Sequence, residues 1–265
     1  CEQCKSFGST SDVWVSLANQ VAEVTSKVYP DRYIETYSYV DTTEAPIHQT
    51  KVHPNVVIHY CVYRSTYWPS CMVLDSPFNA PGRKALAGWR KLWPRIGLCY
   101  YPMECSEWQY VWPSFPSDVA IVRDFAEHRA FLATYFGMVP AHSASSPQQA
   151  SFGDLRRYVM TRLSDEPNLD ADKLAHDFAR DFYGAAAEPM WKYFTILNEE
   201  PIRRKWVQHC EQHLRGFVTQ DLAGRSLALL DEAEALAGHD VRLRHRILHE
   251  KQTFLWSYLA DKNRG

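Results

Sequence analysis

The first 140 residues alternate between apolar, β-rich runs and amphipathic helical segments, and this alternation restricts the fold more than any other feature. The clearest run, residues 55–63 (NVVIHYCVY), is apolar on both faces, as buried strands of parallel sheets are. We also expect strands at residues 33–40, 96–101 and 130–136. Because strands that alternate with helices pair in parallel through crossover connections, the pattern predicts an α/β fold.

Helical segments with apolar spacing separate these strands. The first is expected to begin at Ser11 or Asp12 and to end before Pro30. A second is expected over residues 80–93 and a third after Ser117. The apolar stripe of the first helix consists of Val13, Leu17, Val21, Val24 and Val28.

Four strands are half the number in a (β/α)8 TIM-type barrel, which has eight strands and about 250 residues. Four strands alone would leave two sheet edges unpaired. The alternatives are an open sheet and the C-terminal half of a barrel whose first half lies upstream of Cys1, and we favour the second. The chain opens on Cys1 without an initiator Met, which indicates a processed or truncated start.

The character of the sequence changes after residue 140. Residues 141–150 (AHSASSPQQA) have the composition of a linker, and no strand pattern follows them. Ser151 and Asp154 match a capping box, Asp170 is expected to cap the next helix, and Gly184 is expected to end it. Further helices are expected over residues 186–198, 201–216, 219–237 and 240–260.

The sequence therefore predicts two domains, the C-terminal half of a (β/α)8 barrel over residues 1–140 and an all-helical domain over residues 141–265. The formal net charge of −2 provides no basic field for nucleic acid or an anionic membrane. No apolar run reaches 18 residues, so no membrane insertion is expected.

Cofactor and metal signals are weak. Neither a G-x-G-x-x-G nor a phosphate-binding loop occurs, so we expect no organic cofactor. Cys1 and Cys4 have CxxC spacing without a second pair, and His245 and His249 are four residues apart without an evident third ligand. We therefore expect no metal site.

Several segments resemble one family in order and spacing, and the most specific is Asp181–Ala186 (DFYGAA). The others are Cys1–Cys4, Asn19–Glu23, Tyr29–Asp31, Pro54–Val57, Trp112–Pro116, Leu155–Leu163 and Glu166–Asp170. Over about residues 1–198 the chain is similar to the domain-of-unknown-function family 4838. Some members belong to glycoside hydrolase family 163, endo-β-N-acetylglucosaminidases that act on N-glycans. The resemblance implies a barrel with a helical extension, a glycan substrate, and export of the full-length protein to the periplasm or the cell exterior.

Two features depart from the family's pattern. Members often carry a Glu shortly after the last barrel strand, where this chain has Tyr135–Pro140 (YFGMVP) without a carboxylate. The strands that usually hold the acid and base of such barrels would lie upstream of Cys1. These departures favour an alternative in which the protein binds carbohydrate without cleaving it.

Candidate catalytic residues follow the third expected strand. Most glycosidases use two carboxyl groups, one of which protonates the leaving oxygen. Glu104 and Glu107 are candidates for a general acid or an acceptor from sugar hydroxyls, with solvated loop charges as the alternative.

Aromatic residues near the expected strand ends are candidates for substrate binding. They are Tyr37, Tyr39, Tyr101, Trp108 and Trp112, each of which could instead be part of the core. His59, inside an apolar strand, is expected to be a core histidine rather than a base.

The function we expect is hydrolysis of a glycosidic bond, at N-acetylglucosamine if the resemblance holds, by a glycoside-hydrolase-like protein of which this chain is a fragment. The alternatives are a non-catalytic carbohydrate-binding protein and a structural or interaction module on the same fold. Substitution of Glu104 or Glu107 by Gln separates the first two, because only a hydrolase loses turnover while retaining binding.

Overall fold

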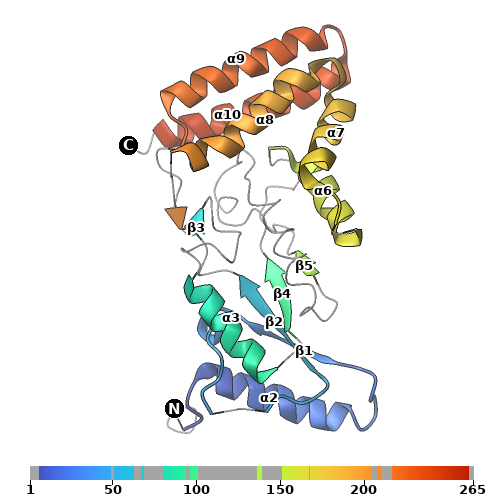
Figure 1. The fold of residues 1–265 in the computed structure, drawn as a ribbon, viewed down its shortest axis with the longest axis vertical. Helices are drawn as coiled ribbons and strands as arrows, with labels where there is room; N and C mark the ends of the chain where they lie inside the picture. Colours follow the sequence, from blue (N-terminus) through green and yellow to red (C-terminus); the bar gives the residue numbers. More distant parts are fainter. Residues whose placement is uncertain are drawn as a thin grey trace. The chain divides into compact units, whose positions relative to one another are not determined.

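The computed structural model describes residues 6–48, 51–62, 67–68, 80–93, 96–100, 136–138, 151–166, 168–204, 208–209 and 217–262, which belong to two compact units (Figure 1). The α/β unit contains α2 (Thr10–Thr25), β1 (Ile34–Ser38), η1 (Val40–Thr42), β2 (Val56–Val62), α3 (Ala80–Leu92), β4 (Ile96–Tyr100) and β5 (Phe136–Met138). The helical unit contains β3 (Tyr67–Trp68), α6 (Gly153–Asp165), α7 (Ala171–Tyr183), η5 (Gly184–Ala186), α8 (Ala187–Arg203), β6 (Gln208–His209), α9 (Gln220–Ala237) and α10 (Val241–Lys262).

The α/β unit is built on a four-stranded parallel sheet with the strand order β1-β2-β4-β5. Its register places Tyr37 beside His59, and His59 beside Gly97. The strands predicted at residues 33–40, 55–63 and 96–101 are confirmed, and so is their parallel pairing. Of the fourth predicted strand only Phe136 lies within the described residues, where it begins β5.

One face of the sheet packs against α3. The Tyr60 hydroxyl donates a hydrogen bond to the Gly82 carbonyl (3.1 Å), and the Trp93 indole N–H donates to the Val56 carbonyl (3.0 Å). Because side chains alternate along a strand, His59 and Cys61 point to the opposite face. The core between the sheet and α3 contains Val56, Ile58, Tyr60, Leu86, Trp89 and Ile96, all buried.

The N-cap of α2 lies two residues before Ser11, the first of the two expected caps. This N-cap is Ser9, whose hydroxyl accepts from the Asp12 N–H while the Asp12 carboxylate accepts from the Ser9 N–H. Ser11 instead donates to the Glu44 carbonyl (2.6 Å). The predicted cap at Ser11 or Asp12 is therefore wrong, although Asp12 completes a capping box three residues into the helix.

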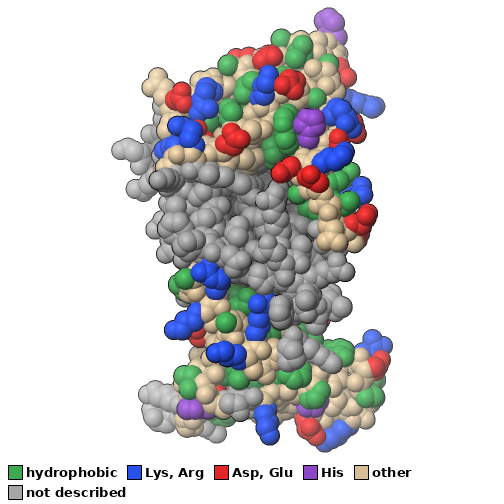
Figure 2. Space-filling view, in the orientation of Figure 1, with side chains coloured by type: hydrophobic (Ala, Val, Ile, Leu, Met, Phe, Trp, Pro, Cys, Tyr) green, Lys and Arg blue, Asp and Glu red, His purple; other side chains and the backbone are tan. Residues whose placement is uncertain are grey.

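The apolar stripe predicted for α2 does not face the sheet. The helix buries Val15, Ala18 and Ala22, whereas Leu17 and Val21 are exposed. Small side chains suit the buried side because they allow the helix to approach the sheet closely. Figure 2 shows apolar side chains at the surface of this part of the molecule; the exposed ones on and next to α2 are Trp14, Leu17, Val21, Val24, Val28 and Tyr29.

The helical unit agrees with most of the predicted helices. Asp170 caps α7 by accepting from the Lys173 N–H (3.0 Å), and Gly184 ends α7 with a positive φ of 48°, both as expected. Helices α9 and α10 lie within two residues of their predicted bounds. The core of the unit contains the fully buried Phe152, Leu163, Tyr193, Phe217 and Phe254.

Three predictions for this unit are wrong. No Ser151–Asp154 capping box forms, because the N-cap of α6 is Phe152 in the left-handed conformation (φ 51°), without a side-chain cap. The helix expected over residues 201–216 is interrupted by β6, which pairs antiparallel with β3. The expectation of no strand after residue 140 fails for the same reason. The predicted domain boundary at residue 140 lies outside the described residues.

None of the helices in the described part of the chain is long and apolar enough to cross a bilayer. On the face shown in Figure 2, Lys and Arg side chains are mixed with Asp and Glu over the helical unit. This mixing includes ion pairs such as Arg225–Asp221 (2.9 Å) and Lys251–Glu234 (2.9 Å).

Candidate functional site

The carboxyl end of β1 is held by a compact network of hydrogen bonds. The buried Ser38 hydroxyl donates to the carbonyls of Thr42 (2.8 Å) and Thr43 (3.2 Å). The Tyr39 N–H donates to the Thr42 hydroxyl (2.8 Å), which in turn lies 2.9 Å from the Tyr39 carbonyl and 3.2 Å from the Tyr37 carbonyl. The turn η1 therefore fixes the backbone of both tyrosines.

Val40, at the start of this turn, has a backbone conformation that its side chain disfavours. Its φ is 50°, in the left-handed region, where a β-branched residue is a genuine outlier. Such strain costs on the order of 1–3 kcal/mol and persists only where the surrounding structure imposes it. The hydrogen bonds of Ser38 and Thr42 on either side supply that constraint. Strained residues concentrate at functional sites, so the end of β1 is a candidate functional site.

Tyr37 and Tyr39 lie at the end of β1 and immediately after it, as predicted. They are two residues apart, and Tyr39 keeps an extended backbone (φ −145°, ψ 137°), so both side chains belong to the same face. Their exposed fractions are 49% and 39%. A tyrosine at such a position offers a flat apolar ring and a hydroxyl group to a ligand.

The imidazole of His59, on the neighbouring strand β2, packs against the ring of Tyr37. The two ring centroids are 5.3 Å apart, and His59 Nε2 lies 3.5 Å from the Oε2 atom of Glu35. Burial lowers the pKa of His59, and the opposing effect of the Glu35 charge does not restore it. The imidazole is therefore neutral at neutral pH. With an exposed fraction of 0%, His59 is the core histidine that the sequence predicted.

Glu35, Tyr37, Tyr39 and His59 thus form one polar and aromatic cluster, which we call the β1 site. Glu35 is half exposed, so the site presents a carboxylate acceptor, two phenol groups and apolar ring surface. This combination suits a sugar, whose hydroxyls both donate and accept hydrogen bonds and whose ring has an apolar face. Among the described residues, no group of three or more His, Cys, Asp or Glu side chains could hold a metal ion.

The other predicted site residues, namely Tyr101, Glu104, Glu107, Trp108 and Trp112, lie outside the described residues. Sequence reasoning missed Glu35 and the strain at Val40. Glu35 could have been found from the alternation of residues 35, 37 and 39 along the expected strand, which places all three on one face. The conformation of Val40 has no sequence signal, since valine is a poor residue for it.

A family model described as "Domain of unknown function (DUF4838)" matches residues 1–195, which include the complete β1 site. No match was found among curated proteins or among solved structures.

Proposed function

The chain belongs to the family of the domain of unknown function DUF4838, and from this premise we propose that it acts on glycans as part of a glycoside-hydrolase-like (β/α)8 barrel protein. The proposed sugar site is at the carboxyl ends of the parallel strands, where barrel enzymes hold their chemistry. The proposed reaction is hydrolysis of a glycosidic bond, at N-acetylglucosamine, without an organic cofactor.

The observation that carries the proposal is the pair of half-exposed tyrosines at the carboxyl end of β1. The hydrogen bonds of Ser38 and Thr42 fix their backbone before any ligand arrives. Preorganised groups lose little conformational entropy on binding, which favours affinity for a ligand as polar as a sugar. Glu35 supplies an acceptor for sugar hydroxyls on the same face of the sheet.

The edge of β1 and the exposed apolar stripe of α2 both support the proposed barrel. Within the described residues β1 pairs with β2 alone, and Glu35 and Tyr37 are half exposed on the face opposite α3. Helix α2, which precedes β1, carries the exposed apolar stripe that contains Leu17 and Val21. A further parallel strand would pair with the edge of β1, and its helix, packed beside α2, would cover the apolar stripe. Glu35 and Tyr37 would stay open to a ligand on the face of the sheet.

Hydrolysis needs carboxyl groups beyond Glu35. We propose Glu104 and Glu107 for this role because they follow β4 in the sequence, and loops after barrel strands hold catalytic groups. Tyr101, Trp108 and Trp112, in the same stretch of sequence, are the proposed further contacts to substrate.

Binding of N,N′-diacetylchitobiose, measured by isothermal titration calorimetry, tests the sugar site. Tyr37→Ala or Tyr39→Ala removes one ring that a bound sugar would cover, which should reduce the binding free energy by about 1–2 kcal/mol. The affinity should then be roughly 5- to 30-fold weaker. Tyr33→Ala is the matched control, since Tyr33 is equally exposed (48%) but precedes β1 at its amino end. Equal weakening by all three variants, or by none, would refute the site.

Turnover of the same disaccharide or of an N-glycan distinguishes a hydrolase from a binding protein. We expect Glu104→Gln or Glu107→Gln to abolish release of reducing sugar while the affinity stays within about twofold. Binding by the wild-type protein without any turnover would instead favour the non-catalytic carbohydrate-binding alternative.

A further inference from the structure

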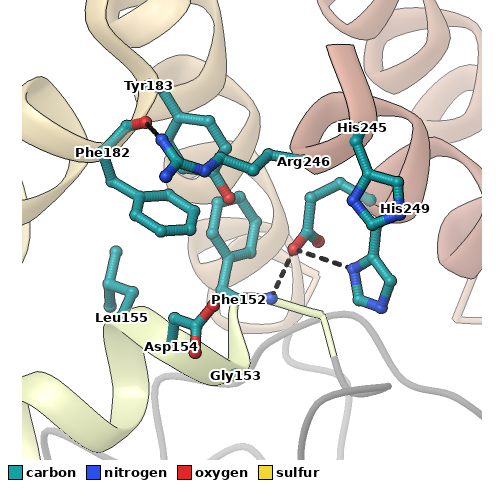
Figure 3. Close-up of a pocket in the computed structure, with 10 residues that line it drawn as sticks. Phe152, Gly153, Asp154, Leu155, Phe182, Tyr183, His245, Arg246 and His249 are labelled. Carbon is teal, nitrogen blue, oxygen red and sulfur yellow. Dashed lines mark hydrogen bonds and ion pairs between the residues drawn. The ribbon is translucent and has the colours of Figure 1, made fainter. Parts of the chain in front are cut away.

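The helical unit contains a pocket of about 120 Å³ that is lined by the start of α6, the last turn of α7 and the first half of α10 (Figure 3). The volume is that of about four water molecules, enough for one edge of a small ring but not for an oligosaccharide. Its polar lining comes from Asp154, His245, Arg246, His249 and Glu250. None of these residues belongs to the α/β unit.

Arg246 is held in the pocket by two contacts with Phe182. Its guanidinium carbon lies 3.9 Å from the centre of the Phe182 ring, and Nη1 donates to the Phe182 carbonyl (2.5 Å), the contact dashed in Figure 3. The ion pairs of α10 within the described residues involve Arg244, His249 and Lys251. A guanidinium carries five N–H donors, so Arg246 retains donors for a ligand in a fixed orientation.

Glu250, by contrast, forms hydrogen bonds with the residues that precede α6. Its carboxylate accepts from the Ser151 hydroxyl (2.5 Å) and from the Phe152 N–H (2.8 Å), and its side chain is almost completely buried. These bonds hold Ser151 and the backbone N–H of Phe152, the N-cap residue of α6, which makes no side-chain cap of its own. Glu250 therefore contributes negative charge to the pocket wall, while its oxygens are occupied by protein donors.

Asp154 supplies the exposed carboxylate of the pocket. It is exposed, stands in the first turn of α6, and lies with its carboxylate directed toward the pocket in Figure 3. The imidazoles of His245 and His249 reach the pocket from α10, and Nδ1 of His249 lies 3.7 Å from the Glu250 carboxylate. Burial raises the pKa of Tyr183, so this phenol at the pocket wall stays protonated.

The charges of the lining restrict the class of ligand. An anion that reached Arg246 would also meet Asp154 and Glu250, and a cation that reached Asp154 would meet Arg246. A hydroxyl group avoids both penalties, because it can donate to a carboxylate and accept from a guanidinium. Hydroxyls on adjacent ring carbons can do both at once.

From this arrangement we propose that the pocket between α6, α7 and α10 is a second ligand site, which binds the vicinal hydroxyl groups of a neutral polyhydroxylated ring such as a monosaccharide. Arg246 donates to the ligand and Asp154 accepts from it, while Glu250 holds the start of α6 in place. The site does not rest on the proposed function of the β1 site, because the two share no residue.

Three probes with the same ring test the ligand class: glucose, its carboxylate analogue glucuronate and its ammonium analogue glucosamine. Binding is measured by NMR titration of the His245 and His249 imidazole resonances, in a Tyr37→Ala/Tyr39→Ala background that disables the β1 site. We expect glucose to bind in the millimolar range and both charged analogues to bind at least threefold more weakly. Tighter binding of either analogue, or unshifted imidazole resonances with all three, would overturn the proposal.

Matched variants test the named residues. Asp154→Asn should weaken glucose binding at least fivefold, and Asp165→Asn, at the other end of α6, should leave it unchanged. Arg246→Met should also weaken glucose binding at least fivefold. Its control is Arg244→Met, which removes an exposed arginine of the same helix that pairs with Glu234. Asp154 is exposed and its variant is expected to fold, so unchanged glucose affinity in Asp154→Asn would refute the site even if Arg246→Met unfolds the unit.

Discussion

Substitution of Val40 tests whether the turn after β1 is strained in the way the backbone indicates. Val40→Ala and Val40→Gly both remove the branched side chain, but only alanine retains a Cβ atom. At a φ of 50° that atom costs about 1–2 kcal/mol, whereas glycine costs about 0.5–1 kcal/mol more chain entropy than alanine. The difference predicts that Val40→Gly is more stable than Val40→Ala by about 0.5–1 kcal/mol.

Hydrogen exchange of peptides that cover residues 34–48, followed by mass spectrometry, measures this local stability directly. Gly224, inside α9, is the control position, because a Cβ added there meets no atom within 4 Å. Gly224→Ala should therefore stabilise its helix by roughly 0.5–1 kcal/mol. Alanine is thus expected to be the more stable residue at position 224, and glycine at position 40. If Val40→Ala proves more stable than Val40→Gly, the turn is not strained, and Val40 no longer marks the end of β1 as a functional site.

Two further substitutions test the hydrogen bonds of Asp12 in the α/β unit and the ion pairs of Glu200 in the helical unit. Asp12→Asn should destabilise the α/β unit by about 2 kcal/mol in urea denaturation. The reason is that an amide cannot accept from all the N–H donors of Ser9, Ile47 and His48 that bond to the carboxylate. Asp31→Asn, at an exposed aspartate, is the control and should have no effect. In the helical unit, burial alone would raise the pKa of Glu200, but hydrogen bonds from Arg203 and Arg225 outweigh it and lower the pKa. Stability from Glu200 is then present above its unfolded pKa of about 4.5 and lost as the pH falls through the lower folded value. Glu200→Gln should remove about 1 kcal/mol at pH 7, a small effect because both arginines are largely exposed, and should flatten the acid limb of a plot of melting temperature against pH.

The elements predicted correctly from the sequence are those whose pattern is local. The apolar run at residues 55–63, the cap at Asp170 and the glycine at position 184 each determine their structure through neighbours in the chain. The Ser151–Asp154 capping box failed because Ser151 bonds to Glu250, a carboxylate 99 positions away. No local pattern could show that competition.

The orientation of α2 and the existence of β6 were missed for the same physical reason. The spacing of Leu17 and Val21 predicts a helix but not which side is buried, and α2 buries Ala18 and Ala22 instead. Strand β6 has only two residues and exists through its pairing with β3. Both features depend on partners distant in sequence.

The candidate sites show the same division. Tyr37 and Tyr39 were predicted because a β-rich run ends at them, and their position is confirmed while their role stays a prediction. The helical pocket was not predicted, since Arg246 and Phe182 are 64 positions apart and meet only in the folded chain.

The most direct test of the account is a titration of the protein, labelled with 13C in its tyrosine rings, with N,N′-diacetylchitobiose. The account predicts saturable shifts of the Tyr37 and Tyr39 resonances, assigned by substitution, while Tyr29 and Tyr33 stay unchanged although they are equally or more exposed. Saturable binding that leaves Tyr37 and Tyr39 unshifted, or no binding of the disaccharide at all, would contradict a glycan site at the end of β1.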